Sequence, residues 1–301
     1  MSYFEVTKNV VAANATNREK SKVNNAAQTI VMSCLALPDK LVFVDCGVYM
    51  KVAEKFRKDM EKKFQRKTSH LILTHMHWDH ILAMKVFKDV DIVVSKKGLA
   101  SLKKDLKGYL SPEELLEYAG QYAAEDTVLA NDIRNADLFL PNIAAKDEFR
   151  INSGEHEILF KVIGNHTAGS AFVYYPQEKT MCAGDNLLEC YPQLLDSNWK
   201  TMDLLQSWEE LDIEHVIPGH GKPVTKEYIT NIQSYYNKLI TFLKEQIKQD
   251  VSFKKALNNP ELPEYFGTTQ SDWYYACRPT ANWLTVSIEG WYKFLKKQEK
   301  K

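Results

Sequence analysis

Short apolar stretches alternate with amphipathic helical stretches along the first half of the chain. One helix is predicted over residues 49–66, with apolar side chains at i, i+4 spacing: Val52, Phe56, Met60 and Phe64. Four runs rich in β-branched residues predict strands, at 28–37, 41–44, 69–74 and 91–95. The polar stretch 13–25 predicts an exposed loop. Strands followed by helices favour a layered α/β fold.

The second half of the chain repeats this pattern. Strands are predicted at 148–151, 157–163, 171–175, 180–183 and 215–217. Helices are predicted over 202–211 and 226–248. Two β-rich halves, each with helices on its outside, predict a four-layer α/β/β/α sandwich.

Two stretches differ from this alternation. Residues 109–140 are acidic, and Ser111-Pro112 is typical of a helix start, so they predict a helical insertion. The insertion could be simply a solvated pair of helices. It could also be a lid over a crevice, because long insertions in compact domains are often functional. The tail is aromatic, and the apolar spacing of Leu284, Ile288, Trp291 and Leu295 predicts a last helix. We expect a domain over 1–250 and a C-terminal extension over 251–301 that packs on it.

The chemistry of the chain is concentrated between residues 74 and 80. His75, His77, Asp79 and His80 follow the strand 69–74 and precede a helix predicted over 79–90, a usual position for a ligand crevice. Imidazole and carboxylate groups suit Zn²⁺, Fe²⁺ or Mn²⁺. His75 and His77 can converge on one ion, which leaves Asp79 and His80 for a second. A purely structural role is disfavoured, because buried imidazoles without partners cost desolvation energy.

The order His75-x-His77-x-Asp79-His80 resembles the H-x-H-x-D-H signature of the metallo-β-lactamase superfamily. Segments similar to the family's other motifs occur in the expected order, over about residues 25–225. Asn165 interrupts one of them, at the position where a glycine would precede the histidine. These segments are Val42–Gly47, Gly164–Ser170, Cys182–Asn186 and Ile217–Gly221.

The resemblance implies the same four-layer fold and a complete set of ligands for two divalent metal ions. Zinc is the first expectation, with iron or manganese as alternatives. The family pattern assigns His75, His77 and His166 to one ion, assigns Asp79, His80 and His220 to the other, and makes Asp185 the bridge. Asp45 either accepts a hydrogen bond from a ligand imidazole or caps the following helix.

Such a centre predicts a binuclear hydrolase in which a bridging hydroxide attacks a carbonyl group. Asp79 would orient the nucleophile or carry a proton, so it is also the candidate catalytic residue. The expected substrate is a small ester-like bond: a lactone, a thioester or a β-lactam. Leu188 replaces the tyrosine of lactonase-like members, and the Pro218–Gly221 segment differs from the thioesterase pattern. The candidate substrate contacts are Tyr191, Trp273, Tyr274 and Arg278.

Two other functions are compatible with the same cluster. The first is a phosphodiesterase or nuclease, although the acidic insertion and a net charge of zero do not favour a polyanionic substrate. The second is a di-iron redox or oxygen-binding protein. Relatives of that kind tend to carry a carboxylate where this chain has His77.

Composition limits the expected location and partners. The 39 basic and 39 acidic residues give no overall field toward nucleic acid or an anionic membrane. Glu5 and Lys8 stand where a signal peptide would be apolar, and no apolar run approaches a membrane span. The five cysteines are scattered, which is typical of a reducing compartment. We therefore expect a cytoplasmic enzyme that acts on a small molecule.

Overall fold

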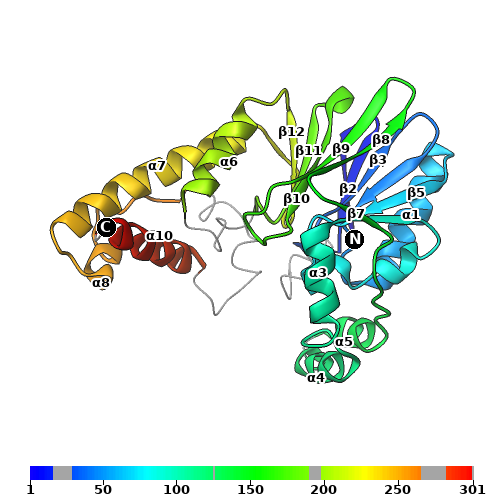
Figure 1. The fold of residues 1–301 in the computed structure, drawn as a ribbon, viewed down its shortest axis with the longest axis horizontal. Helices are drawn as coiled ribbons and strands as arrows, with labels where there is room; N and C mark the ends of the chain where they lie inside the picture. The colour runs from blue at the N-terminus through cyan, green and yellow to red at the C-terminus, as the bar shows by residue number, and fades with distance from the viewer. Residues whose placement is uncertain (16–28, 125, 190–197, 266–282, 300–301) are drawn as a thin grey trace.

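The computed structural model describes residues 1–15, 29–124, 126–189, 198–265 and 283–299. Two β-sheets pack face to face, and helices lie on their outer faces (Figure 1). The prediction of a four-layer α/β/β/α sandwich is therefore confirmed.

Within the described residues, the first sheet contains seven strands that follow one another in chain order. They are β1 (Ser2–Thr7), β2 (Val10–Asn14), β3 (Met32–Ala36), β4 (Leu41–Val44), β5 (Thr68–Ile72), β6 (Asp91–Ser95) and β7 (Ile143–Ala145). The first four pair antiparallel, and β4 to β7 pair parallel. The carboxyl ends of the parallel strands thus share one edge, where ligands usually bind.

The second sheet has the order β13-β12-β11-β10-β9-β8. Its strands are β8 (Glu148–Ser153), β9 (His156–Val162), β10 (Ala171–Tyr175), β11 (Thr180–Gly184), β12 (His215–Pro218) and β13 (Val224–Thr225). Only β11 and β12 pair parallel in this sheet, as far as the structure describes it. The residues after β11 and β12 therefore also leave the sheet at the same edge.

Successive residues of the central strands belong to different hydrophobic cores. In β4, Leu41 and Phe43 pack toward the outer helices, whereas Val42 and Val44 pack between the two sheets. Strands buried on both faces consist of nearly continuous apolar residues. This burial explains why the run 41–44 could be identified as a strand from sequence.

The helices lie on both sides of the paired sheets and beyond them. Those of the first half are α1 (Met50–Phe64), α2 (Trp78–Ile81), η2 (Met84–Phe87), α3 (Lys96–Asp105), α4 (Pro112–Tyr122) and α5 (Thr127–Arg134). Those of the second half are η3 (Pro176–Glu178), α6 (Trp199–Glu209), α7 (Glu227–Lys248), α8 (Phe253–Leu257) and α10 (Trp283–Glu299). None of the described helices has the length and apolar character needed to cross a membrane.

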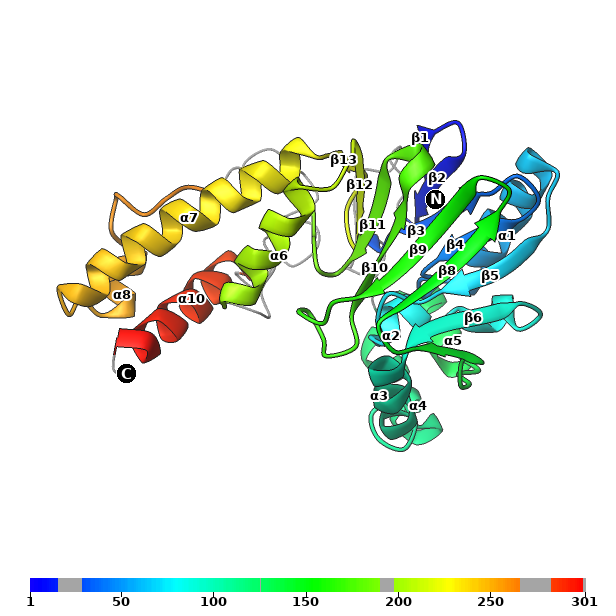
Figure 2. The ribbon, with the colours of Figure 1, turned by 45° about the horizontal axis from the view of Figure 1, so that its top comes forward.

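The helical tail is confirmed, and it packs mainly on α7. Ile288, Trp291 and Leu295 are buried, and the Trp291 ring lies 5.6 Å from the Tyr236 ring of α7. Helices α7, α8 and α10 extend away from the sandwich (Figures 1 and 2). The division into a domain over 1–250 and an extension over 251–301 stays a prediction.

Two local predictions are wrong. The helix predicted over 79–90 is divided into α2 and η2. The break occurs because the Ala83 N–H donates to the Gly47 carbonyl (3.0 Å), in the loop after β4, and so does not continue the hydrogen bonding of the helix. The loop predicted over 13–25 begins as strand, since Ala13 and Asn14 are buried in β2. The Asn14 amide donates to the Gly221 carbonyl (2.8 Å), which explains why a polar residue is buried there.

The acidic insertion forms the predicted helix pair, α4 and α5. Asp132 accepts a hydrogen bond from Met50 N–H (3.1 Å) and so caps α1, which has no side-chain cap of its own. On its other side the insertion contacts the histidine turn, where the Tyr118 and Trp78 rings lie 5.1 Å apart. The insertion is therefore anchored at two points. Its role as a lid stays a prediction.

Candidate metal centre

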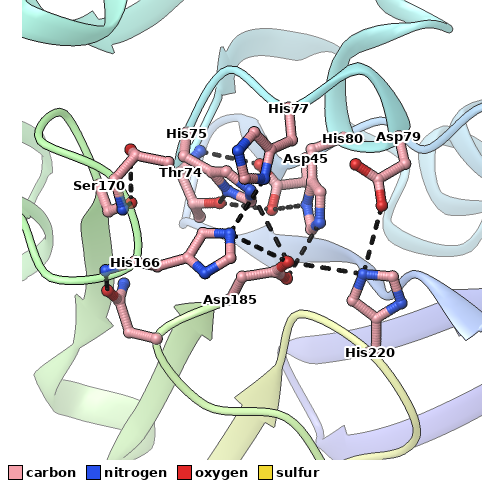
Figure 3. Close-up of polar contacts among 12 residues, drawn as sticks. Asp45, Thr74, His75, His77, Asp79, His80, His166, Ser170, Asp185 and His220 are labelled. Carbon is pink, nitrogen blue, oxygen red and sulfur yellow. Dashed lines mark hydrogen bonds and ion pairs between the residues drawn. The ribbon is translucent and has the colours of Figure 1, made fainter. Parts of the chain in front are cut away.

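The predicted ligands gather at the edge where the strands of both sheets end (Figure 3). They come from the turn after β5, from α2, from the turn between β9 and β10, and from the segments that follow β11 and β12. The structure brings together His75, His77, Asp79, His80, His166, Asp185 and His220. None of the proposed metal ligands is displaced from the cluster.

The first group of donors contains three imidazoles and a carboxylate. His75, His77, His166 and Asp185 place one donor atom each within 4.8 Å of one another. His166 Nε2 lies 3.0 Å from His77 Nδ1 and 3.5 Å from Asp185 Oδ2. Nitrogen and oxygen donors in this number suit a four-coordinate zinc ion.

The second group of donors is Asp79, His80 and His220. His220 Nε2 lies 3.4 Å from Asp79 Oδ2 and 3.6 Å from Asp185 Oδ2. His80 Nε2 lies 3.0 Å from the other oxygen of Asp185. Asp185 therefore stands between the two groups, as a bridging carboxylate would.

Buried atoms without partners support a cation at this centre. His75 Nε2, His80 Nε2 and Asp185 Oδ1 are buried and form no hydrogen bond within the described part of the chain. His80 Nε2 and Asp185 Oδ1 are close enough for an ion pair, but they are not oriented for a hydrogen bond. Each buried polar atom left in this state costs about 1–3 kcal/mol. Coordination by divalent metal ions would satisfy all three, so the donor set fits such ions.

The imidazoles of the first group are held neutral. Burial lowers the pKa of His75 well below its usual range, and the neighbouring charge of His80 lowers it further. Burial also lowers the pKa of His77, and it lowers the pKa of His166 to about 4. These rings therefore have a free lone pair for a metal at neutral pH.

The imidazoles of the second group behave in the opposite way. Burial lowers the pKa of His220, but the carboxylates of Asp185 and Asp79 outweigh it and raise the value to about 10. The carboxylates of Asp185 and Asp45 likewise outweigh burial and raise the pKa of His80 well above its usual range. Without a metal, protons supply the positive charge that the carboxylates require.

Residues behind the ligands fix the orientation of their rings. His80 Nδ1 donates to Asp45 Oδ2 (2.9 Å), and Thr74 donates to the same carboxylate through its N–H and its hydroxyl (both 2.8 Å). The Thr74 hydroxyl can then accept a hydrogen bond from His75 Nδ1 (3.2 Å). This places the proton of His75 on Nδ1 and leaves Nε2, which lies on the side of Asp185, with a free lone pair. Of its two predicted roles, Asp45 thus has the first: it accepts a hydrogen bond from a ligand imidazole. It does not cap α1, whose N-cap residue is Tyr49.

Several contributors to the site were missed from sequence. Thr29 lies 3.0 Å from His220 Nδ1, and Asn186 accepts from the His166 N–H (3.3 Å). At Gly219 a Cβ atom would lie only 2.0 Å from Asp185 Oδ1. Gly219 could be recognised from sequence as part of a motif, but its close approach to Asp185 could not. A single threonine in an apolar segment gave no signal.

The predicted substrate contacts Tyr191, Trp273, Tyr274 and Arg278 lie outside the described residues. Two cavities in the described part lie beside the ligand turns. One, of about 230 Å³, is lined by Trp78, Tyr109, Tyr118 and the carboxylates Glu114 and Glu117. The other, of about 490 Å³, is lined in part by the turn that carries His166.

Comparisons with known proteins agree with this geometry. The sequence profile of the metallo-beta-lactamase superfamily matches residues 34–220, a range that includes every proposed ligand. No curated protein matches the chain.

Three solved structures illustrate the structural similarity. The sec-alkylsulfatase Pisa1 from Pseudomonas sp. has a TM-score of 0.67 and 16% identity, covering 97% of this chain and 50% of that one. A family protein from Thermus thermophilus has a TM-score of 0.61 and 15% identity, with 98% and 95% covered. A metallo-beta-lactamase from Pontibacter korlensis has a TM-score of 0.52 and 15% identity, with 77% and 97% covered. The chain thus spans half the length of the alkylsulfatase. At these identities the similarity shows the fold alone.

Proposed function

The chain belongs to the metallo-beta-lactamase superfamily, and we propose that it is a metal-dependent hydrolase that uses two divalent ions to cleave a small ester-like bond. A lactone, a thioester or a β-lactam is the expected substrate. The observation that carries the proposal is the pair of donor groups that share Asp185. Two cations held close together require an anionic bridge to offset their repulsion, and the carboxylate of Asp185 would provide that bridge.

Divalent ions bound here would polarise a substrate carbonyl and lower the pKa of a water molecule toward neutrality. Asp79 is the ligand best placed to handle the proton. Its side chain is 19% exposed, whereas those of His80, His220 and Asp185 are at most 8% exposed. Its pKa is lowered, because the hydrogen bond to His220 and the charge of His80 outweigh its burial. An ionised carboxylate facing the open side can orient a water molecule and accept its proton.

Zinc is our first choice of metal, because histidine nitrogens predominate among the donors. Iron and manganese remain alternatives, since the same ligand types bind them. A di-iron redox site is less well supported, because His77 provides an imidazole where a carboxylate would be expected. A nuclease is less well supported because the net charge is zero and Glu114 and Glu117 lie beside the histidine turn.

The proposal can be tested by metal analysis followed by a substrate panel. Protein prepared with excess zinc should contain two equivalents of metal and should hydrolyse at least one of a δ-lactone, an acyl thioester and a cephalosporin. Chelator-treated protein is the matched control. Bis(4-nitrophenyl) phosphate and an alkyl sulfate complete the panel, the latter because an alkylsulfatase shares this fold.

Metal content that stays at or below one equivalent would reject the binuclear centre. Turnover of the phosphodiester or the sulfate ester alone would reject the ester-like carbonyl substrate. An iron-oxo absorption band in the protein as purified would favour the redox alternative.

A further inference from the structure

The cavity of about 490 Å³ shares a wall with the metal centre. Gly164, Asn165 and Ala168 belong to the turn that carries His166, and they line the cavity together with residues of α3, α6 and α10. This turn reaches from the second sheet toward α6 and α10 (Figure 2). The volume lies within the range of small-molecule sites, about 300–1,000 Å³.

The walls of this cavity are held together by specific contacts. The Ser95 hydroxyl donates to the Gly169 carbonyl (2.6 Å), and a Cβ atom at Gly169 would lie only 2.5 Å from the Gly98 nitrogen. On the other side, the Thr201 hydroxyl donates to Asn165 Oδ1 (3.0 Å). The His166 turn is thus pinned between the first turns of α3 and α6. A group bound in the cavity would therefore keep a defined position relative to the metal ligands.

Among the described residues, the charged groups that line this cavity are all positive. Lys97 is the second residue of α3 and Lys200 the second residue of α6, so two helix N-termini reach the same cavity. Helix N-termini carry partial positive charge and attract anions. Neither lysine forms an ion pair with any described residue, and no Asp or Glu is among the described lining residues. The other cavity has the opposite character, with Glu114 and Glu117 in its wall.

Asn165 adds a hydrogen-bond donor that lacks an acceptor. Its Oδ1 accepts from Thr201, while its Nδ2 is buried and has no partner among the described residues. The backbone of Asn165 is left-handed (φ 80°), a conformation that asparagine tolerates better than most residues. Buried donors are normally satisfied, so this amide fits a ligand that supplies an oxygen. Asn165 is also the residue that interrupts the family's glycine–histidine motif.

We propose that this cavity binds an anionic group of the substrate, a carboxylate or a similar oxyanion on a partly apolar molecule. This inference rests on the proposed function, because it places the scissile bond of the same molecule at the metal centre. Lys97 and Lys200 supply positive charge, and the Asn165 amide donates to the oxyanion. Trp199, which is 41% exposed, and Phe294 of α10 provide aromatic surface for the apolar part.

A binding experiment tests the cavity without requiring turnover. Octanoate, octyl sulfate and octylammonium are titrated into the zinc-loaded, full-length protein by calorimetry. The double variant Lys97→Gln/Lys200→Gln should bind octanoate about tenfold more weakly than the wild type. The control Lys103→Gln/Lys104→Gln removes the same charge from the far end of α3 and should bind it normally. Asn165→Ala should weaken binding as well, and melting temperatures show whether each variant is folded.

The anions in this experiment also separate the two kinds of oxyanion. Tighter binding of octyl sulfate than of octanoate, lost in the double variant, would assign the cavity to a sulfate group rather than a carboxylate. Equal octanoate affinity in wild type, double variant and control would overturn the proposal. Binding of octylammonium alone would also overturn it, in favour of the acidic cavity beside Trp78.

A kinetic experiment links the cavity to the reaction. Three butyryl thioesters differ mainly in the charge of their leaving group: thioglycolate is anionic, mercaptoethanol neutral and thiocholine cationic. The wild type should have its highest kcat/KM with the anionic ester. In the double variant the KM for this ester should rise about tenfold, so that its advantage over the neutral ester falls by the same factor. An unchanged preference would overturn the inference even if hydrolysis proceeds. If no thioester is hydrolysed, that part of the proposed function fails, and octanoate binding still decides the inference.

Discussion

The two halves of the metal centre use the same kinds of side chain in opposite states. His75, His77 and His166 are neutral because burial disfavours their charged form. His80 and His220 are protonated because carboxylates surround them. Burial alone therefore does not decide the state of a histidine here. What decides it is whether a carboxylate is hydrogen-bonded to the ring: carboxylates raise the pKa of His80 and His220 through hydrogen bonds and charge, but they act on His77 and His166 through charge alone.

This difference implies an order in which the centre fills. A histidine must be neutral to bind a metal, so any proton on it has to leave first. The histidines of the first half are ready at neutral pH, whereas His80 and His220 must each release a proton. We therefore expect the first ion to bind to His75, His77 and His166. The second ion should follow and displace protons.

Asp185→Asn should have the largest effect, because both halves share this carboxylate. An amide in its place removes the negative charge that a pair of ions requires, and activity should fall by roughly a hundredfold or more. Metal content should fall to one equivalent or less. Kinetics and elemental analysis of the purified variant test this, with Asp203→Asn, an exposed change on α6, as the control. Activity within twofold of the wild type would remove Asp185 from the centre.

Removing one ligand from each half compares them directly. His220→Ala should still bind one zinc ion tightly, because the first half is intact. His77→Ala should bind no ion tightly at pH 7, because the remaining half must give up its protons. Both variants should lose about a hundredfold in activity, close to the loss for a removed catalytic group. Zinc titration with a competing chelator distinguishes them, and equal first affinities in the two variants would contradict the proposed order.

Gly219→Ala should disturb the shared carboxylate without changing any ligand. Because the new Cβ would lie 2.0 Å from Asp185 Oδ1, the carboxylate has to move. We expect activity to fall about thirtyfold, since small displacements at a catalytic centre are costly. Gly120→Ala on α4 is the matched control, because no atom lies within 4 Å of its Cβ position. Equal activity of the two variants would show that Asp185 tolerates displacement.

The positions of the ligands were predictable for a local reason. Each of them lies in a short segment in which a strand end, a glycine or a histidine pair is visible without knowledge of the rest of the chain. His166, for example, stands in a turn bounded by Gly164 and Gly169. Strand ends meet at one edge in a layered α/β fold, so the convergence of these segments followed from the fold.

The features that were missed depend on contacts between distant segments. The division of the helix after Asp79 results from Gly47, more than thirty residues earlier, and no pattern within 79–90 indicates it. Thr29 contributes because Ile30 forms a bridge with His220, which joins segments from opposite ends of the domain. Hydrophobic periodicity describes one element at a time, so contacts of this kind are not encoded in it.

Metal affinity should depend on pH differently in the two halves. The pKa of His166 is about 4, so no proton competes for this ring above pH 5, and the affinity for the first ion should stay within about threefold from pH 6 to 8. In the metal-free protein the pKa of His220 is about 10, so the ring carries a proton over this whole range until a metal ion displaces it. The affinity for the second ion should therefore rise about tenfold per pH unit for each proton displaced. Calorimetry in buffers of different ionisation enthalpy counts these protons. Equal pH dependence for both ions would contradict the comparison.

The smallest expected effect concerns the groups behind the second half. Asp45 holds His80 through a charged hydrogen bond, whereas Thr29 faces His220 with a neutral hydroxyl. Charged hydrogen bonds are roughly twice as strong as neutral ones, and partners behind a ligand typically contribute 10–100-fold in metal affinity. Asp45→Asn should therefore weaken binding of the second ion about tenfold, and Thr29→Val less than threefold, as measured by chelator competition.

Because Asp45 also raises the pKa of His80, its loss should make that proton easier to displace. The pH dependence of the second ion should then become shallower in Asp45→Asn and remain unchanged in Thr29→Val. If both variants behave alike, Asp45 orients the ring but does not account for the protonated state of this half.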